Sequence, residues 1–253
     1  MSGRIAQRIE ERPNGHVAFL RVVRPEKLNV LNAALMAALR DALRVLAEDD
    51  GLRAVVIEGE GTRAWIGGAD IREMATLDAV GARQLITLLH DTCDAVRRCP
   101  VPVVAAIRGW ALGGGLELAA SCDLRIATVG ARFAMPEVRI GIPSVIEARL
   151  LPMLIGWGRA RRLLLTGETI DAARAEAWGL VEEVVAEDML EAAVGRVLDA
   201  ILASAPGAVR AQKRLIAGWE EQSGPAAIAA SVSAFAASFG DGEPQARMKR
   251  ALG

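Results

Sequence analysis

The sequence predicts an α/β fold, because short apolar runs that suit buried strands alternate with segments whose apolar residues recur at helical spacing. One such cycle of two strands, a helix and a further strand is already complete by residue 57. The chain has 253 residues, of which 52% are hydrophobic, so it has ample apolar surface for a buried core. These observations favour a globular α/β protein of one large domain or two small ones.

The chain is expected to open with a β-hairpin. Strands are predicted at 5–10 and 16–23, with Asn14-Gly15 as the turn signal between them. A helix follows at 33–47, and the β-branched run at 53–57 predicts the next strand. The leucines that recur at helical spacing are Leu35, Leu39, Leu43 and Leu46.

The same cycle repeats further along the chain. The expected elements are helices at 79–97 and 113–121 and strands at 101–107 and 124–127. After Glu137 the residues Leu, Ala and Arg dominate, and only 181–185 has the composition of a strand. The last third is therefore expected to be mainly helical.

Pro206 and Gly207 mark an expected boundary between a core domain at 1–205 and a C-terminal helical region at 206–253. Helices are predicted there at about 208–218 and 225–239. Their many alanines and few charges offer little to the core of a monomer, so we expect an oligomerisation region.

Composition argues against several partners. Thirty basic and thirty-one acidic residues nearly cancel, and aromatic residues make up 4% with no tyrosine, so nucleic acid is not expected. No apolar run approaches membrane-spanning length, so we expect no membrane contact and a cytoplasmic location. Cys93, Cys99 and Cys122 are odd in number and lie in helical or apolar contexts, which predicts buried, reduced thiols.

Common catalytic signatures are missing. His16 and His90 stand alone, each interpreted as a surface or loop histidine, so no metal site is expected. No serine lies in a Gly-x-Ser-x-Gly elbow. The glycines at 109–115 fit neither a dinucleotide fingerprint nor a P-loop. The chemistry must therefore come from other groups.

A run of three glycines, 113–115, stands at the start of a predicted helix, where glycine is costly. Two explanations are open: a ligand approaches the free first-turn amides, or the helix packs tightly on a strand. Glu117 favours the first explanation, because it lies three residues after Gly114 and shares a helix face with that amide. An anion-stabilising donor and an acid or base would then face one pocket.

A second loop, Gly67-Gly68-Ala69-Asp70-Ile71, follows the strand predicted at 53–57 and its turn. Asp70 is interpreted as a helix N-cap, because Glu73 three residues later completes an acidic variant of the capping box. The backbone amide of Ala69 is the second candidate donor.

Four segments together resemble the crotonase (enoyl-CoA hydratase/isomerase) family, and the resemblance covers nearly the whole chain. They are the early loop at 24–32, the loop at 67–71, the glycine-rich segment at 109–119 and the carboxylate segment at 132–137. The resemblance implies a spiral of repeated β-β-α units with a helical C-terminal oligomerisation region, assembled as a trimer or a dimer of trimers. It also implies an acyl-CoA substrate, whose coenzyme A is not a separate cofactor.

Roles for single residues follow from the resemblance alone. The amides of Ala69 and Gly114 would form an oxyanion hole for the thioester oxygen, and Glu117 and Glu137 would be the acid-base pair that holds a water at the double bond. Without the family, Glu137 would be an ordinary first-turn residue after Pro136. The residues implied to bind substrate or coenzyme A are Arg24, Lys27, Leu28, Gly67, Gly68, Asp70, Ile71 and Gly113, although a solvated surface charge is the simpler interpretation of Arg24 and Lys27.

The sequence departs from the family in two places. Where the family often has Pro-Gly-Ala-Gly-Gly-Thr, residues 141–148 carry larger side chains and an additional acid, Glu147. The tail is shorter than usual, so Lys249 and Arg250 are not assigned to coenzyme A. Both glutamates are kept, which favours an enoyl-CoA hydratase, a hydro-lyase of fatty acid metabolism. The alternatives are isomerase, hydrolase or lyase chemistry on the thioester, or a non-catalytic paralogue that binds acyl-CoA or RNA.

Overall fold

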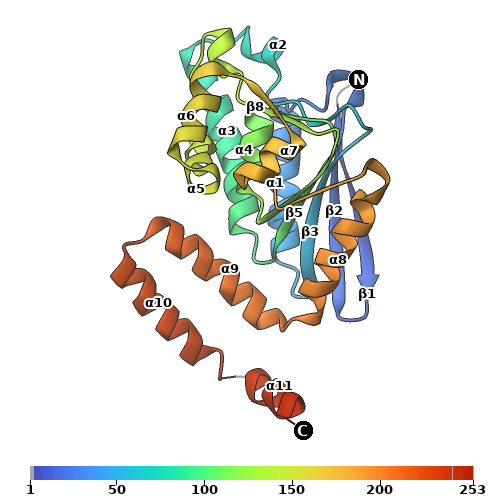
Figure 1. Cartoon of the computed structure of the whole chain (residues 1–253), viewed down its shortest axis with the longest axis vertical. Coiled ribbons are helices and arrows are strands. Elements are labelled where there is room, and N and C mark those ends of the chain that lie inside the picture. The colour runs from blue at the N-terminus through green and yellow to red at the C-terminus, as the bar shows by residue number, and fades with distance from the viewer. Residues whose placement is uncertain (1–2, 241, 253) are drawn as a thin grey trace.

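The computed structural model describes residues 3–240 and 242–252, and Figure 1 shows an α/β body with its last helices extending away from it. The opening hairpin is confirmed: β1 (Arg4–Arg12) pairs antiparallel with β2 (Gly15–Val23). Its two-residue loop is Pro13-Asn14 rather than the expected Asn14-Gly15. Gly15 instead begins β2 with a φ of +115°, a conformation that glycine adopts without steric cost.

Six strands form the larger sheet in the order β1-β2-β3-β5-β7-β10, and every pairing after the hairpin is parallel. Its remaining strands are β3 (Leu52–Gly59), β5 (Val103–Ile107), β7 (Leu124–Thr128) and β10 (Glu183–Val185). Every residue of β5 is buried, as expected for a parallel strand covered on both faces. One face packs against α1 (Ala33–Ala47) and α3 (Ala79–Arg98), and the other against α8 (Leu190–Ala203).

A smaller sheet of four strands, β4-β6-β8-β9, was not predicted. Its members are β4 (Ala64–Ile66), β6 (Trp110–Leu112), β8 (Arg132–Ala134) and β9 (Thr169–Asp171). In each cycle the first strand joins the larger sheet and the second joins the smaller one: β3 then β4, β5 then β6, β7 then β8. This repeated step confirms the predicted spiral of β-β-α units.

Helices fill most of the remaining chain, as expected for its last third. The α-helices are α2 (Ile71–Met74), α4 (Gly114–Ser121), α5 (Leu151–Ile155), α6 (Trp157–Thr166), α7 (Ala172–Trp178), α9 (Pro206–Glu221), α10 (Gly224–Ala237) and α11 (Glu243–Leu252). Short 3₁₀-helices are η1 (Pro25–Lys27), η2 (Glu137–Ile140), η3 (Ile146–Leu150) and η4 (Glu187–Met189). Helix α9 begins two residues earlier than expected, and β10 begins two residues later. The division into two domains stays a prediction.

Figure 1 shows α9 and α10 reaching away from the sheets. No single helix within residues 3–240 and 242–252 is long and apolar enough to cross a membrane, although Glu187–Ala203 and Pro206–Glu221, bent by 108°, meet that test as a pair.

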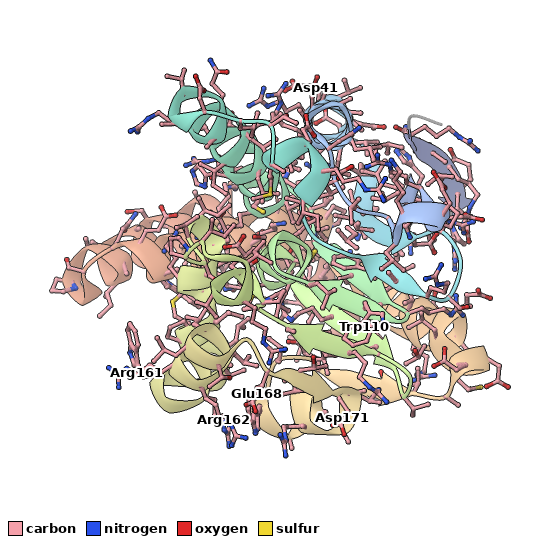
Figure 2. The ribbon with its side chains drawn as sticks, turned by 90° about the horizontal axis from the view of Figure 1, so that it is seen from above. Asp41, Trp110, Arg161, Arg162, Glu168 and Asp171 are labelled. Carbon is pink, nitrogen blue, oxygen red and sulfur yellow. The ribbon has the colours of Figure 1, made fainter. Side chains whose placement is uncertain are left out.

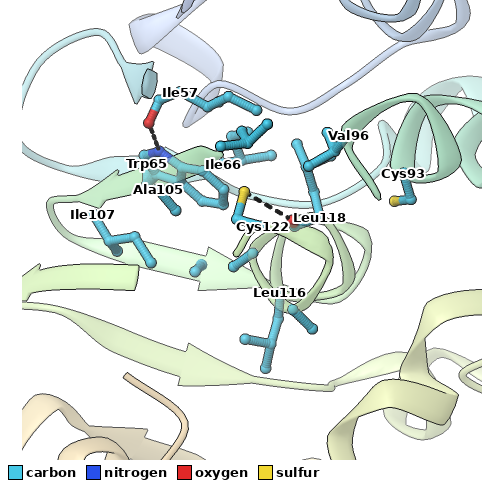
Figure 3. Close-up of a cluster of buried hydrophobic side chains, with 14 of the residues drawn as sticks. Ile57, Trp65, Ile66, Cys93, Val96, Ala105, Ile107, Leu116, Leu118 and Cys122 are labelled. Atoms are coloured by element: carbon cyan, nitrogen blue, oxygen red, sulfur yellow. Dashed lines mark hydrogen bonds between the residues drawn. The ribbon is translucent and has the colours of Figure 1, made fainter. Parts of the chain in front are cut away.

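The core between the larger sheet and α4 is apolar, with polar atoms paired inside it. Figure 3 shows the buried Trp65 donating its indole N–H to the carbonyl of Ile57 at 3.0 Å. The thiol of Cys122 donates to the carbonyl of Leu118 at 3.4 Å. All three cysteines are buried and unpaired with one another, which confirms the predicted thiols. Viewed from above, Asp41 on α1 and Asp171 beside α7 mark opposite edges of this body (Figure 2).

Candidate active site

The three glycines at the start of α4 serve different purposes. Gly113 is the N-cap with a φ of +50°, and a β-carbon on it would overlap the carboxylate of Glu137. A β-carbon on Gly115 would overlap the backbone carbonyl of Ile66. The packing explanation of the glycine run is confirmed for Gly115, while Gly113 makes room for a carboxylate of the protein itself and the approach of a ligand stays a prediction.

The amides of Ala69 and Gly114 border one small gap. A β-carbon built on Gly114 would lie 3.8 Å from the Ala69 nitrogen, and one built on Gly68 would lie 3.8 Å from the Gly114 nitrogen. Neither amide donates a hydrogen bond to another residue in the described part of the chain. The Ala69 loop is held by Leu31, whose amide donates to Gly68 at 2.8 Å and whose carbonyl accepts from Asp70 at 2.9 Å. Two free donors are thus fixed side by side.

Glu117 lies on the first turns of α4 and is only 3% exposed. Its Oε1 accepts a hydrogen bond from the amide of Ala148 at 2.9 Å. Burial raises the pKa of Glu117 to about 8, and the nearby carboxylates of Glu137 and Glu147 raise it as well, while the Ala148 amide lowers it. Burial therefore favours the protonated form of Glu117.

Glu137 opens η2 and points its carboxylate toward the Gly113 turn. Burial raises its pKa, opposed by hydrogen bonds from its own backbone amide and from the hydroxyl of Ser144, which donates to Oε2 at 2.9 Å. Two glutamates with raised pKa values across one cavity can exchange a proton with a bound molecule, because neither is locked into its charged form.

A cavity of about 280 Å³ brings these groups together. Its walls include Gly67, Gly68, Ala69, Ile71, Gly113, Gly114, Glu117, Glu137 and Ser144. A second cavity of about 400 Å³, lined by Ala, Ile, Leu and Met side chains, lies between α2 and α3 and shares several walls with the first. The shared residues are Ala69, Ile71, Met74, Ile86, Leu89, Ile140 and Ile142. The polar centre thus adjoins an apolar chamber.

The early loop at 24–32 contacts the loop at 67–71, and its Arg24 is not the solvated surface charge that was the simpler interpretation. Arg24 is 5% exposed rather than a solvated surface charge, because its guanidinium donates to Asp70 at 2.8 Å and to the carbonyl of Val30 at 3.2 Å. Lys27 ends η1, and the carbonyl of Leu28 accepts from the Gly67 amide at 2.9 Å. Neither Arg24, Lys27 nor Leu28 lines the cavity that holds the two glutamates.

Asp70 is confirmed as the N-cap of α2, since its carboxylate accepts from the Arg72 amide at 3.1 Å. The other half of the predicted capping box, a hydrogen bond from the Asp70 amide to Glu73, is wrong. The carboxylate of Glu73 instead accepts from the amide of Ala33 at 3.1 Å. Glu73 thereby ties α2 to the start of α1. Ile71, also expected to bind substrate, is 61% exposed at the rim of both cavities.

His90 is a surface histidine, as predicted, and His16 is partly buried; both lie in regular elements rather than loops. His16 is on β2 and contacts Asp49 at 2.8 Å, and His90 is on α3 with Nδ1 2.8 Å from Glu147. The described residues contain no group of three or more histidine, cysteine or acidic side chains that could hold a metal ion.

Comparisons with known proteins show which family the chain resembles. The family model described as enoyl-CoA hydratase/isomerase matches residues 12–249. A crotonyl-CoA hydratase from Syntrophomonas wolfei is 37% identical over 198 residues, covering 78% of this chain and 76% of that protein. A short-chain-enoyl-CoA hydratase from Clostridium acetobutylicum is 36% identical over 203 residues, covering 80% and 78%. The crystal structure of an enoyl-CoA hydratase from Polaromonas sp. JS666 superposes with a TM-score of 0.91 at 27% identity, covering 99% and 97%.

A β-β-α spiral with a glycine-lined cavity between two glutamates defines a protein of the crotonase superfamily. Within that class, the chain belongs to the enoyl-CoA hydratase/isomerase family.

Proposed function

We propose that this protein is an enoyl-CoA hydratase that adds water across the double bond of an α,β-unsaturated acyl-CoA thioester. One observation carries the proposal: the unpaired amides of Ala69 and Gly114 border the same cavity as the carboxylates of Glu117 and Glu137. The hydratase names of the two relatives from Syntrophomonas wolfei and Clostridium acetobutylicum favour the same reaction.

In the proposed reaction the thioester oxygen accepts hydrogen bonds from the amides of Ala69 and Gly114. Addition of hydroxide to the β-carbon moves negative charge onto this oxygen, and preorganised donors stabilise that charge. Glu117 and Glu137 hold one water, from which one carboxylate takes a proton while the other gives a proton to the α-carbon. These two proton transfers leave a β-hydroxyacyl thioester. The two glutamates together hold one proton before and after the reaction.

No cofactor is needed beyond the coenzyme A that the substrate carries. We propose that the loops at 24–28 and 67–71 border this coenzyme A, with Lys27 available to its phosphates and with Arg24 acting through Asp70 rather than by direct contact. The buried, unpaired cysteines are in keeping with a cytoplasmic enzyme. The exposed apolar stripe of α10, formed by Ile228, Val232 and Phe235, is in keeping with a trimer or a dimer of trimers.

The direct test follows the absorbance of the enoyl thioester as the purified protein acts on enoyl-CoA substrates of increasing chain length. A hydratase consumes the conjugated double bond at a rate proportional to enzyme concentration. A non-catalytic acyl-CoA-binding protein would bind the substrate without any loss of this absorbance. That result would overturn the proposal.

Glutamine variants separate hydration from isomerisation, which is the closest rival. Glu117→Gln and Glu137→Gln keep the side-chain shape but remove a proton acceptor, so each should lower kcat for hydration by at least roughly 100-fold. The double variant should resemble the worse single variant, because the two groups act as a unit on one water. An isomerase needs one base, so one of the single variants would keep substantial activity on a β,γ-unsaturated substrate.

A further inference from the structure

Glu147 is a buried carboxylate that the proposed reaction does not use. It lies in η3 and is 0% exposed. Its Oε1 is 2.8 Å from Nδ1 of His90, and its Oε2 has no hydrogen-bond partner in the described part of the chain. A fully buried carboxylate with an unpaired oxygen is costly, so its retention calls for a reason.

The surroundings of Glu147 link it to the catalytic centre. The next residue, Ala148, donates its amide to Oε1 of Glu117 at 2.9 Å, so η3 directly contacts the carboxylate of Glu117. On its other side η3 packs against α3, where His90 holds Glu147. Contacts therefore run without a break from His90 on α3, through Glu147 and Ala148, to the carboxylate of Glu117.

We propose that His90 and Glu147 form a positioning pair, which fixes η3 so that the Ala148 amide holds Glu117 and which places a third carboxylate behind the two that face the substrate. This inference rests on the proposed hydration, and its two residues act through Glu117 without touching the substrate. Glu147 is absent from the walls of the cavity, in agreement with such an indirect role.

Glu147 raises the pKa of Glu117. Beside burial, which is the largest cause, Glu137 and Glu147 both raise the pKa of Glu117. Titratable groups of α3 also interact with Glu147: His90, the buried thiol of Cys93, and Arg97, whose guanidinium pairs with Glu220 and Glu221 of α9. Removing the negative charge of Glu147 therefore lets Glu117 lose its proton at a lower pH.

The experiment measures the titration of Glu117 itself, independently of turnover. Infrared difference spectra across a pH series report the protonated carboxyl band of Glu117, assigned by its loss in Glu117→Gln. Glu147→Gln keeps the shape and removes the charge, so the midpoint should fall. His90→Ala releases η3 and weakens the Ala148 hydrogen bond that favours the ionised form of Glu117, so its midpoint should rise.

The pH dependence of hydration should follow these shifts. The alkaline limb of kcat/KM should move to lower pH in Glu147→Gln and to higher pH in His90→Ala. Arg98→Ala is the matched control, because Arg98 is exposed on the same helix and pairs with Asp94 on that helix. It should leave both readings unchanged.

An unshifted midpoint in Glu147→Gln overturns the inference, because a merely structural glutamate would change stability without changing the titration of Glu117. Should that variant fail to fold, His90→Ala decides the question, since His90 is half-exposed. A lower or unchanged midpoint in His90→Ala overturns the inference too. Loss of the proposed function is a separate result, visible as a wild-type protein that titrates normally but hydrates no enoyl-CoA.

Discussion

The absence of a side chain at Gly113, at the start of α4, leaves room for the carboxylate of Glu137. Replacing Gly113 by Ala forces a side chain into a φ of +50° and pushes Glu137 from its place. We expect a loss of roughly 1–3 kcal/mol in stability from backbone strain. A displaced acid-base group should also lower kcat by roughly 100-fold. Urea unfolding and steady-state hydration measure the two effects.

Gly195→Ala is the matched control for this change. Gly195 lies within α8, has no heavy atom within 4 Å of an added β-carbon and does not adopt a positive φ. Alanine there should stabilise the helix by up to about 1 kcal/mol and leave kcat unchanged. Equal behaviour of the two alanine variants would contradict the role given to Gly113.

Burial of Glu117 should make the stability of the protein depend on pH in an unusual direction. Its pKa is about 8 in the folded state, against an ordinary value of 4.5, so the folded protein binds this proton more tightly than the unfolded chain does. The contribution of Glu117 to stability therefore declines as pH rises from about 4.5 to about 8, and is constant above that range. Most carboxylates in ion pairs act with the opposite sign.

Glu117→Gln removes this dependence, because the amide does not titrate. Relative to the wild type, the variant should gain stability steadily between pH 4.5 and pH 8, reaching a few kcal/mol at the upper end. Denaturant unfolding of both proteins at several pH values isolates the difference from all other titrating groups. A difference that stays constant across this range would show that Glu117 titrates normally.

Among the secondary-structure elements, long periodic segments could be predicted from sequence and short ones could not. The helix at 33–47 was expected with its observed bounds, because its leucines recur at helical spacing. The strands of the smaller sheet have three residues each, too few to carry a periodic signal. They exist because the spiral brings their backbones together.

The residues of the candidate site also fall into those that could be predicted from sequence and those that could not. Its glycines and glutamates could be selected because they lie in compact local patterns at 67–71, 113–117 and 136–137. The pairing of His90 with Glu147 spans 57 residues, and the burial of Arg24 against Asp70 spans 46 positions of chain. Tertiary packing brings such partners together, so no local sequence pattern predicts them. Glu147 was conspicuous only as a departure from the family.

The apolar chamber between α2 and α3 should determine which acyl chains are accepted. Leu85 lines only this chamber, away from the two glutamates. Leu85→Trp should fill it and raise KM for long-chain enoyl-CoA by roughly tenfold or more, while a four-carbon substrate keeps its KM. Thr87→Trp, at an exposed position of the same helix, is the control. Equal effects on short and long substrates would show that the chain lies elsewhere.

At the scale of the whole molecule, the C-terminal helices expose apolar side chains that the body does not cover. Ile228, Val232 and Phe235 on α10 are 67%, 65% and 69% exposed, and their spacing places them on one helix face. Trp219 on α9 is 50% exposed. Figure 1 shows these helices projecting from the sheets, where a single chain gives them few neighbours. Large exposed apolar stripes are typical of surfaces that bind another protein.

The last prediction concerns this stripe on α10. If it is buried between copies of the chain, a charge in its centre must be desolvated on assembly, which opposes association. Phe235→Asp should therefore shift the assembly from trimers, or multiples of three, toward smaller species in multi-angle light scattering at micromolar concentration. Ser233→Asp adds the same charge to an exposed position off the stripe and should leave the molar mass unchanged. A monomeric wild type would contradict the predicted oligomerisation region, and equal dissociation by both aspartates would show that net charge, rather than this stripe, governs assembly.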